Sequence, residues 1–95
     1  MVPSGYVLKQ NYPNPFNPDT RIEFTIPASE QVSVNVYNLE GRLVKTLIDQ
    51  EMRSGQHVVR WDGTNQVGTK VATGMYIYQL KTNSTVLHRR MTFVK

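Results

Sequence analysis

The sequence predicts an all-β domain, an immunoglobulin-like antiparallel β-sandwich of about seven strands. Three observations support this fold class. Turn signals recur about every 8 to 14 residues, the segments between them alternate apolar with polar residues, and no segment leaves room for a long helix. The 95 residues fit one domain, and a hydrophobic fraction of 39% suits a modest globular core rather than a disordered tail.

Alternation defines the strands one by one. In segment 20–27 the apolar residues are Ile22, Phe24 and Ile26, with polar residues between them, so one face is buried and the other is wet. The strands are expected at residues 6–11, 20–27, 31–38, 42–52, 56–62, 74–82 and 85–94. The residues expected to form the core are Ile22, Phe24, Val34, Val36, Val59, Trp61, Tyr76 and Tyr78.

The segment 42–52 has a mixed signal. Its apolar residues Leu43, Val44, Leu47 and Ile48 recur with a helical period. We interpret it as a strand because it is short, follows a turn at Gly41 and has strands for neighbours.

The first 19 residues form a proline-rich, irregular lead-in that contains the first strand, and residues 20–95 form the sandwich proper. Pro13, Pro15 and Pro18 each fix their own φ and push the preceding residue toward extended conformations. We expect a stiff segment whose Tyr12 and Phe16 tuck against the edge of the sandwich.

Composition excludes several kinds of function. The chain has no cysteine, so disulfides, thiolate metal sites and thiol nucleophiles are ruled out. No apolar run approaches the roughly 20 residues of a transmembrane helix. The first residues do not resemble a signal peptide, so we expect either an intracellular protein or a piece of a longer chain whose signal lies upstream.

Charge is unevenly distributed. Residues 1–62 sum to −1, whereas residues 63–95 hold five Lys or Arg and no acid. A basic C-terminal third favours an acidic protein partner, an anionic membrane surface or nucleic acid. Nucleic acid is the weakest of these, because the chain has no recognition helix, zinc motif or ladder of basic and aromatic residues.

Several motifs together resemble the C-terminal sorting domains of type IX secretion. The opening QNYPNPFNP at 10–18 resembles the start of those domains, and VNVYNLEGRLV at 34–44 resembles their central strand, turn and strand. WDG at 61–63 and GMYIYQL at 74–80 resemble the late core, and the short basic end at 91–95 resembles the terminal signal. The resemblance covers almost the whole chain.

This resemblance implies a non-catalytic immunoglobulin-like domain at the end of a larger secreted protein. Such a domain directs its N-terminal cargo through the outer-membrane secretion machinery to the cell surface or exterior, and a sortase-like peptidase often removes it. The same sandwich is similar to the immunoglobulin-like domain of flagellar hook-capping proteins, which leaves a structural assembly module as an alternative. A carbohydrate-binding or adhesin module is a third possibility.

Trp61 and the loop after it have competing interpretations. Trp61 is either a stacking platform for a sugar or base, or a large core aromatic residue, which we favour. The loop 62–68 is either a Ca²⁺ site or a turn in which Asp62 and Asn65 bond the nearby backbone, and one carboxylate is too few for a metal. We therefore expect no metal and no cofactor.

No spacing suggests a catalytic triad. His57 and His88 would each need a nucleophile and an orienting carboxylate to act as general bases, and we expect both to be surface residues. Tyr76 is expected to bond back to the backbone as in a tyrosine corner. The sequon at 83–85 is interpreted as a hairpin turn.

The most promising functional residues are His88, Arg90 and Lys95. We expect them to dock the last strand onto an acidic receptor, although basic side chains on an edge strand also discourage unwanted pairing. Alternation places Arg89 nearer the core side, with its charged group at the rim.

Overall fold

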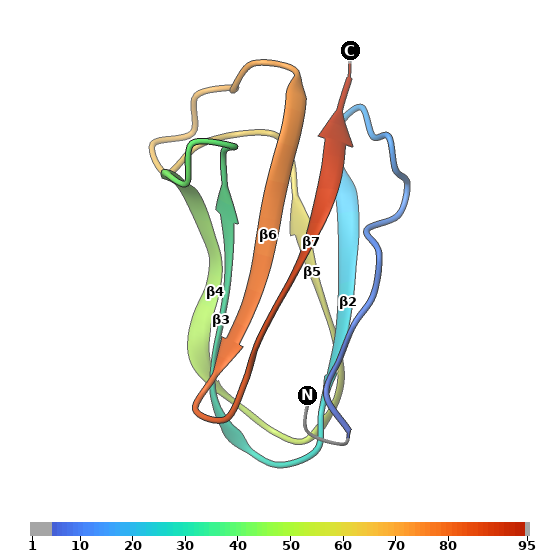
Figure 1. Ribbon diagram of the computed structural model, residues 1–95, viewed down its shortest axis with the longest axis vertical. Helices are drawn as coiled ribbons and strands as arrows, with labels where there is room; N and C mark the ends of the chain where they lie inside the picture. Colours follow the sequence, from blue (N-terminus) through green and yellow to red (C-terminus); the bar gives the residue numbers. More distant parts are fainter. Residues whose placement is uncertain (1–4, 95) are drawn as a thin grey trace.

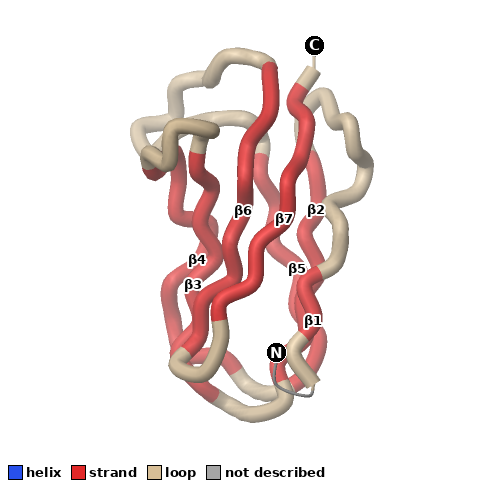
Figure 2. The backbone as a smooth tube through the Cα atoms, viewed as in Figure 1, coloured by secondary structure: helices blue, strands red, loops and turns tan. Residues whose placement is uncertain are grey.

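The computed structural model describes residues 5–94 and shows two antiparallel β-sheets packed face to face (Figures 1 and 2). The strands are β1 (Val7–Leu8), β2 (Thr20–Ile26), β3 (Glu30–Tyr37), β4 (Leu43–Met52), β5 (Gly55–Trp61), β6 (Gly74–Thr82) and β7 (Val86–Phe93). One sheet has the order β1-β2-β5 and the other β4-β3-β6-β7. The predicted all-β immunoglobulin-like sandwich is therefore confirmed. Within the described part of the chain, no helix has the length and apolar character needed to cross a membrane.

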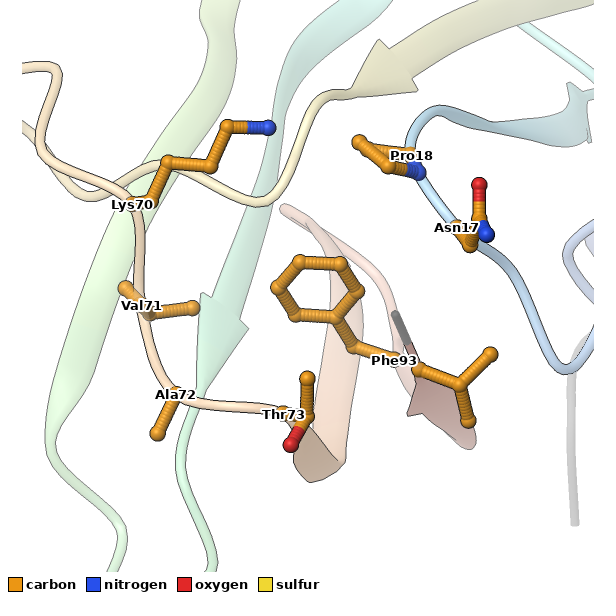
Figure 3. Close-up of a pocket in the computed structure, with 8 residues that line it drawn as sticks. Asn17, Pro18, Lys70, Val71, Ala72, Thr73 and Phe93 are labelled. Carbon is orange, nitrogen blue, oxygen red and sulfur yellow. The ribbon is translucent and has the colours of Figure 1, made fainter.

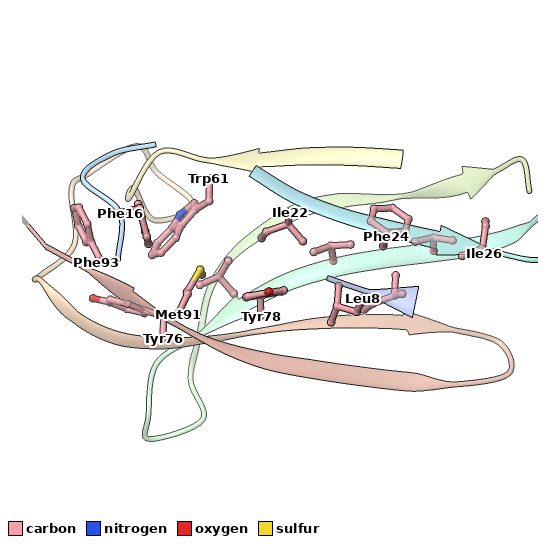
Figure 4. Packing of buried hydrophobic residues seen from close by; sticks show 14 residues of the cluster. Leu8, Phe16, Ile22, Phe24, Ile26, Trp61, Tyr76, Tyr78, Met91 and Phe93 are labelled. Carbon is pink, nitrogen blue, oxygen red and sulfur yellow. The ribbon is translucent and has the colours of Figure 1, made fainter. Parts of the chain in front are cut away.

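The core lies between the sheets and is formed by alternate residues of each strand (Figure 4). The buried hydrophobic side chains are Leu8, Phe16, Ile22, Phe24, Ile26, Val32, Val34, Val36, Trp61, Tyr76, Tyr78, Leu80, Met91 and Phe93. Of the residues expected in the core, Val59 is only half-buried. It lies on β5, the outer strand of its sheet, and so has a sheet neighbour, Ile22, on one side only.

Two β-bulges explain the mixed signal of segment 42–52. The pairing of β3 with β4 shifts register twice, and each shift leaves one β4 residue, Leu47 and then Val44, without a Cα partner on β3. A bulge sets two consecutive residues opposite one and interrupts the alternation of faces. The adjacent apolar pairs 43–44 and 47–48 therefore mark bulges in a strand, not turns of a helix.

The proline-rich lead-in crosses from one sheet to the other (Figure 1). Its start, β1, pairs with β2, and Tyr12 makes an isolated bridge to Arg21. Further along, Phe16 makes a parallel bridge to Phe93 of β7 in the opposite sheet. The strand expected at 6–11 is thus reduced to β1. The Phe16 side chain is buried and that of Tyr12 is exposed, so only one of the two aromatic residues tucks into the sandwich.

Candidate docking surface on the C-terminal strand

Strand β7 forms one edge of the four-stranded sheet, with β6 as its only neighbour in that sheet among the described residues. Met91 and Phe93 are buried in the core, so alternation turns His88 and Arg90 to the outer face of the sheet, where both are exposed. The structure therefore brings these two predicted docking residues onto one face. The third, Lys95, lies outside the described residues.

Arg89 lies in the inward register of β7, opposite Tyr78. Its Nε donates a hydrogen bond of 2.5 Å to the carbonyl oxygen of Leu8, which links the edge strands of the two sheets. Arg89 is nevertheless exposed as a whole. Its long side chain reaches the rim of the sandwich, where the charged group stays in water. Arg89 therefore has a structural role, whereas His88 and Arg90 face outward.

The lead-in covers the C-terminal half of the β7 edge. The Phe16 N–H donates to the Thr92 carbonyl oxygen at 2.9 Å, and the Val94 N–H donates to the Phe16 carbonyl oxygen at 2.8 Å. The Asn14 Oδ1 accepts a hydrogen bond from the Thr92 N–H at 3.0 Å. In this half, therefore, the outward backbone of the last strand is not free to face a partner. Sequence reasoning missed the polar role of the lead-in.

A buried tyrosine anchors this lead-in. The Tyr78 hydroxyl donates to the Lys9 carbonyl oxygen at 2.6 Å and accepts from the Asn11 N–H at 2.8 Å. Burial raises the pKa of Tyr78 to about 12, although the hydrogen bond from Asn11 acts in the opposite direction. The Asn11 side chain donates in turn to the Pro13 carbonyl oxygen and to Thr20 Oγ1. The partners of Tyr78 are 67 and 69 residues away, so no local signal could reveal them.

Trp61 is a core residue with no face open to a ligand. Its ring is 1% exposed and stands edge-on to Tyr76, with 5.1 Å between ring centroids. Its Nε1 donates to the Thr64 carbonyl oxygen at 2.8 Å. The Tyr76 hydroxyl donates to the Ala72 carbonyl oxygen at 2.5 Å, the backward bond expected of a tyrosine corner, and burial raises the pKa of Tyr76.

The loop after Trp61 is a closed polar turn. Asp62 Oδ1 accepts hydrogen bonds from Thr64 Oγ1 at 2.6 Å and from the Thr64 N–H at 3.1 Å. The hydrogen bond from the Thr64 hydroxyl, and to a lesser extent the positive charge of Lys45, hold the pKa of Asp62 below its ordinary value, although partial burial acts in the opposite direction. Asn65 Oδ1 accepts from two later backbone N–H groups. Across residues 5–94 no three His, Cys, Asp or Glu side chains gather where they could hold a metal.

The histidines do not form an acid–base arrangement. His57 Nε2 lies 2.7 Å from the Arg53 carbonyl oxygen, and its ring packs on Phe24. His88 lies on the other sheet, and neither histidine is hydrogen-bonded to a carboxylate within the described part of the chain. The sequon residues 83–85 form the turn between β6 and β7, where Thr82 Oγ1 accepts from two backbone N–H groups.

An open hollow of ≈ 710 Å³ lies where β7 ends (Figure 3). It is lined by Asn17, Pro18, Lys70, Val71, Ala72, Thr73, Phe93 and Val94. Lys70 is the one charged residue in this lining. The hollow therefore offers apolar contact area, but its lining holds no pair of groups that could exchange a proton.

Comparison with known proteins finds similarity to bacterial proteins, both in sequence and in fold. A family model described as the FlgD Ig-like domain matches residues 14–85. The basal-body rod modification protein FlgD of Salmonella typhimurium and that of Salmonella typhi are each 38% identical over 55 residues, which is 58% of this chain and 23% of theirs. The chain thus spans less than a quarter of the length of these curated relatives.

Among solved structures, dimeric latent PorU from Porphyromonas gingivalis matches 95% of this chain and 9% of its own, with a TM-score of 0.72 and 25% identity. FlgD from P. aeruginosa matches 79% of this chain and 60% of its own, with a TM-score of 0.63 and 24% identity. PorZ from Porphyromonas gingivalis, a surface component of the type-IX secretion system, matches 90% of this chain and 11% of its own, with a TM-score of 0.60 and 22% identity. The last two likenesses show the fold alone.

Proposed function

Because this chain belongs to the FlgD Ig-like domain family, we propose that it is a non-catalytic docking module carried by a longer, exported bacterial protein. One observation carries the proposal: exposed basic side chains, among them His88 and Arg90, lie together at a sheet edge of an otherwise well-packed sandwich. Such charges steer encounter with an acidic partner and select it. The module acts through its surface, outside the cytoplasm, on the cell surface or in the medium.

One specific form of this function is structural assembly. The family match and the two Salmonella relatives, which are basal-body rod modification proteins, favour it. In this form the sandwich is a rigid spacer or contact domain within a protein assembly of the flagellar hook-cap kind. The tightly packed core and the anchored lead-in suit a part that transmits position rather than one that changes shape.

The other specific form is sorting through type IX secretion. It is supported by the ordered motifs from QNYPNPFNP to the basic C-terminal end and by the likeness to PorU over 95% of the chain. In this form the partners are the outer-membrane secretion machinery, a sortase-like peptidase and a covalently linked N-terminal cargo domain. His88, Arg90 and Lys95 are the proposed docking residues.

A charge-reversal experiment tests the docking function. A fluorescent reporter fused before Tyr6 is expressed in a bacterium with type IX machinery, and its export is measured. Arg90→Glu with Lys95→Glu is expected to reduce export of a folded reporter. The control, Arg42→Glu with Arg53→Glu, makes the same charge change at exposed residues outside β7 and is expected to be exported normally.

The two forms of the function give different results. Export of the unaltered fusion supports sorting, and equal export of the variant with Arg90→Glu and Lys95→Glu would refute electrostatic docking even if sorting survives. For assembly, the chain replaces the immunoglobulin-like segment of Salmonella FlgD, and swimming motility is measured. Restored motility without type IX export supports the assembly form, and failure of both assays would overturn the proposed function.

A further inference from the structure

With respect to residues 5–94, the N-terminal half of β7 presents an unpaired backbone edge. The even-numbered residues of this strand direct their backbone groups away from β6, as the outward hydrogen bonds of Thr92 and of the Arg90 carbonyl oxygen show. Gln10 Nε2 occupies that Arg90 oxygen at 2.6 Å, and the lead-in covers the edge from Thr92 to Val94. Within the described residues, the N–H and C=O of His88 and the N–H of Arg90 have no such partner.

This open stretch results from the path of the lead-in (Figure 2). Residues 7–8 pair with β2 in one sheet, and residues 14–16 contact β7 in the other. The described part of the lead-in therefore leaves the first half of β7 uncovered as it crosses. An edge strand with free N–H and C=O groups is a ready template for another strand. The uncovered stretch spans residues 86–90.

An apolar groove runs beside the open edge. It has a volume of ≈ 300 Å³ between β1 and β7 and is lined by Tyr6, Val7, Leu8, Leu87, His88 and Arg89. The hydrogen bond from Arg89 to Leu8 joins its two walls. A strand added to β7 would turn every second side chain into this groove, where apolar side chains fit.

The opposite face of such a strand would meet positive charge. Arg90 lies on the outer face of the sheet, and Lys81 lies on the same face of β6, opposite Val86. The sequence has no acid after Asp62, so β6 and β7 provide no carboxylate to neutralise these residues. Acidic side chains on the outward face of an added strand would pair with them.

We infer that residues 86–90 of β7 bind an extended segment of a partner protein as an added β-strand, one whose side chains alternate between acidic, facing Arg90 and Lys81, and apolar, facing the groove beside Leu8. Main-chain hydrogen bonds supply the affinity and the alternation supplies the specificity, as in other cases of strand addition. The inference deepens the proposed docking function and rests on it.

A defined peptide tests this inference with the 95-residue chain. The probe is a capped hexapeptide of alternating Glu and Val, titrated into isotope-labelled protein and followed by NMR. Chemical-shift changes are expected at residues 6–8 and 86–90, with cross-strand contacts to His88. At a free peptide concentration of ten times Kd, exchange of the His88 amide hydrogen should slow about tenfold, since only about one molecule in eleven remains free.

Two control peptides separate the components of binding. A hexapeptide of alternating Lys and Val is expected to bind at least about tenfold more weakly, because its charges repel Arg90. A Glu–Val peptide N-methylated on every residue, so that it cannot donate along either edge, should not bind. Binding of the acidic peptide should weaken as salt rises.

Two variants of His88 separate the contribution of its backbone N–H to peptide binding from that of its side chain. His88→Pro removes the outward N–H without touching the hydrogen bonds to β6, so the fold should persist and peptide binding should fall at least about tenfold. His88→Ala keeps that N–H and should retain most of the binding. If His88→Pro does not fold, the N-methylated peptide makes the same test.

The inference is overturned if the acidic peptide fails to bind at millimolar concentration, if its N-methylated form binds equally well, or if the shifts map to another surface. These outcomes can be distinguished from a failure of the proposed function. If the chain binds the peptide but fails both in the export assay and in the motility assay, the strand-binding site is supported and the proposed function is refuted. A chain that is exported without binding the peptide retains the role and loses the strand site.

Discussion

Replacing Tyr78 by Phe removes one buried hydroxyl and leaves the ring, so the volume of the core hardly changes. The substitution leaves the N–H of Asn11, a residue that is 2% exposed, without a hydrogen-bond acceptor, and it removes the hydrogen bond to the Lys9 carbonyl oxygen. A buried donor without a partner costs about 1–3 kcal/mol, and a lost hydrogen bond adds about 1 kcal/mol. We therefore expect Tyr78→Phe to lower the free energy of unfolding by about 2–4 kcal/mol.

The assay is urea unfolding followed by the fluorescence of Trp61, the single tryptophan, which is buried in the folded state. Tyr12→Phe is the matched control, because Tyr12 is 71% exposed and the same atom is removed. It should change stability by less than about 0.5 kcal/mol. If Tyr78→Phe lies within that range of the control, the anchoring of the lead-in by this hydroxyl is wrong.

Three further outcomes are expected. Trp61→Ala should cost about 3–5 kcal/mol in urea unfolding, as for a large core aromatic residue, and a near-neutral result would put Trp61 on the surface. Gly63→Ala places a Cβ 2.8 Å from the Phe93 ring at a φ of +80°, whereas Gly68, the site of the control Gly68→Ala, has a similar φ with nothing within 4 Å. In thermal unfolding, Gly63→Ala should lose about 1–3 kcal/mol more stability than Gly68→Ala. Equal losses of stability would contradict the packing argument. The raised pKa of Tyr78 means that the unfolded chain releases this proton first, so stability should fall as pH rises from 10 to about 12. The Tyr78→Phe variant should lose that part of the pH dependence, and a slope unchanged from the unaltered chain would refute the assignment.

Alternation predicted the strands from β2 onward because each sheet has one buried face, whereas the strand expected at 6–11 is reduced to β1. The period of two in β2 and β3 follows from that burial, and the tight turns follow from Gly and Asn-rich stretches. It was ambiguous in β4, where bulges at Val44 and Leu47 depend on the register of a neighbouring strand. Register is a property of two segments, so one segment cannot reveal it.

The candidate surface was predictable in part. The sequence indicated that His88 and Arg90 share a face, because they are two residues apart on a strand, and charge counting pointed to that strand. It did not indicate that the lead-in covers half of the edge. That arrangement depends on Tyr78, Asn11 and Asn14, whose contacts join residues far apart in the chain and leave no local signature.

The path of the lead-in also determines how the domain responds to mechanical load. β1 lies toward one end of the long axis and β7 finishes near the other (Figure 2). A pull between these ends runs along the strands, and the parallel contact of Phe16 with β7 is loaded in shear. In shear the bonds to Thr92 and Val94 must break together, whereas in peeling they would break one at a time. The domain is therefore built to resist traction along its axis, and its lifetime under force would be set by an unfolding barrier rather than by its equilibrium stability.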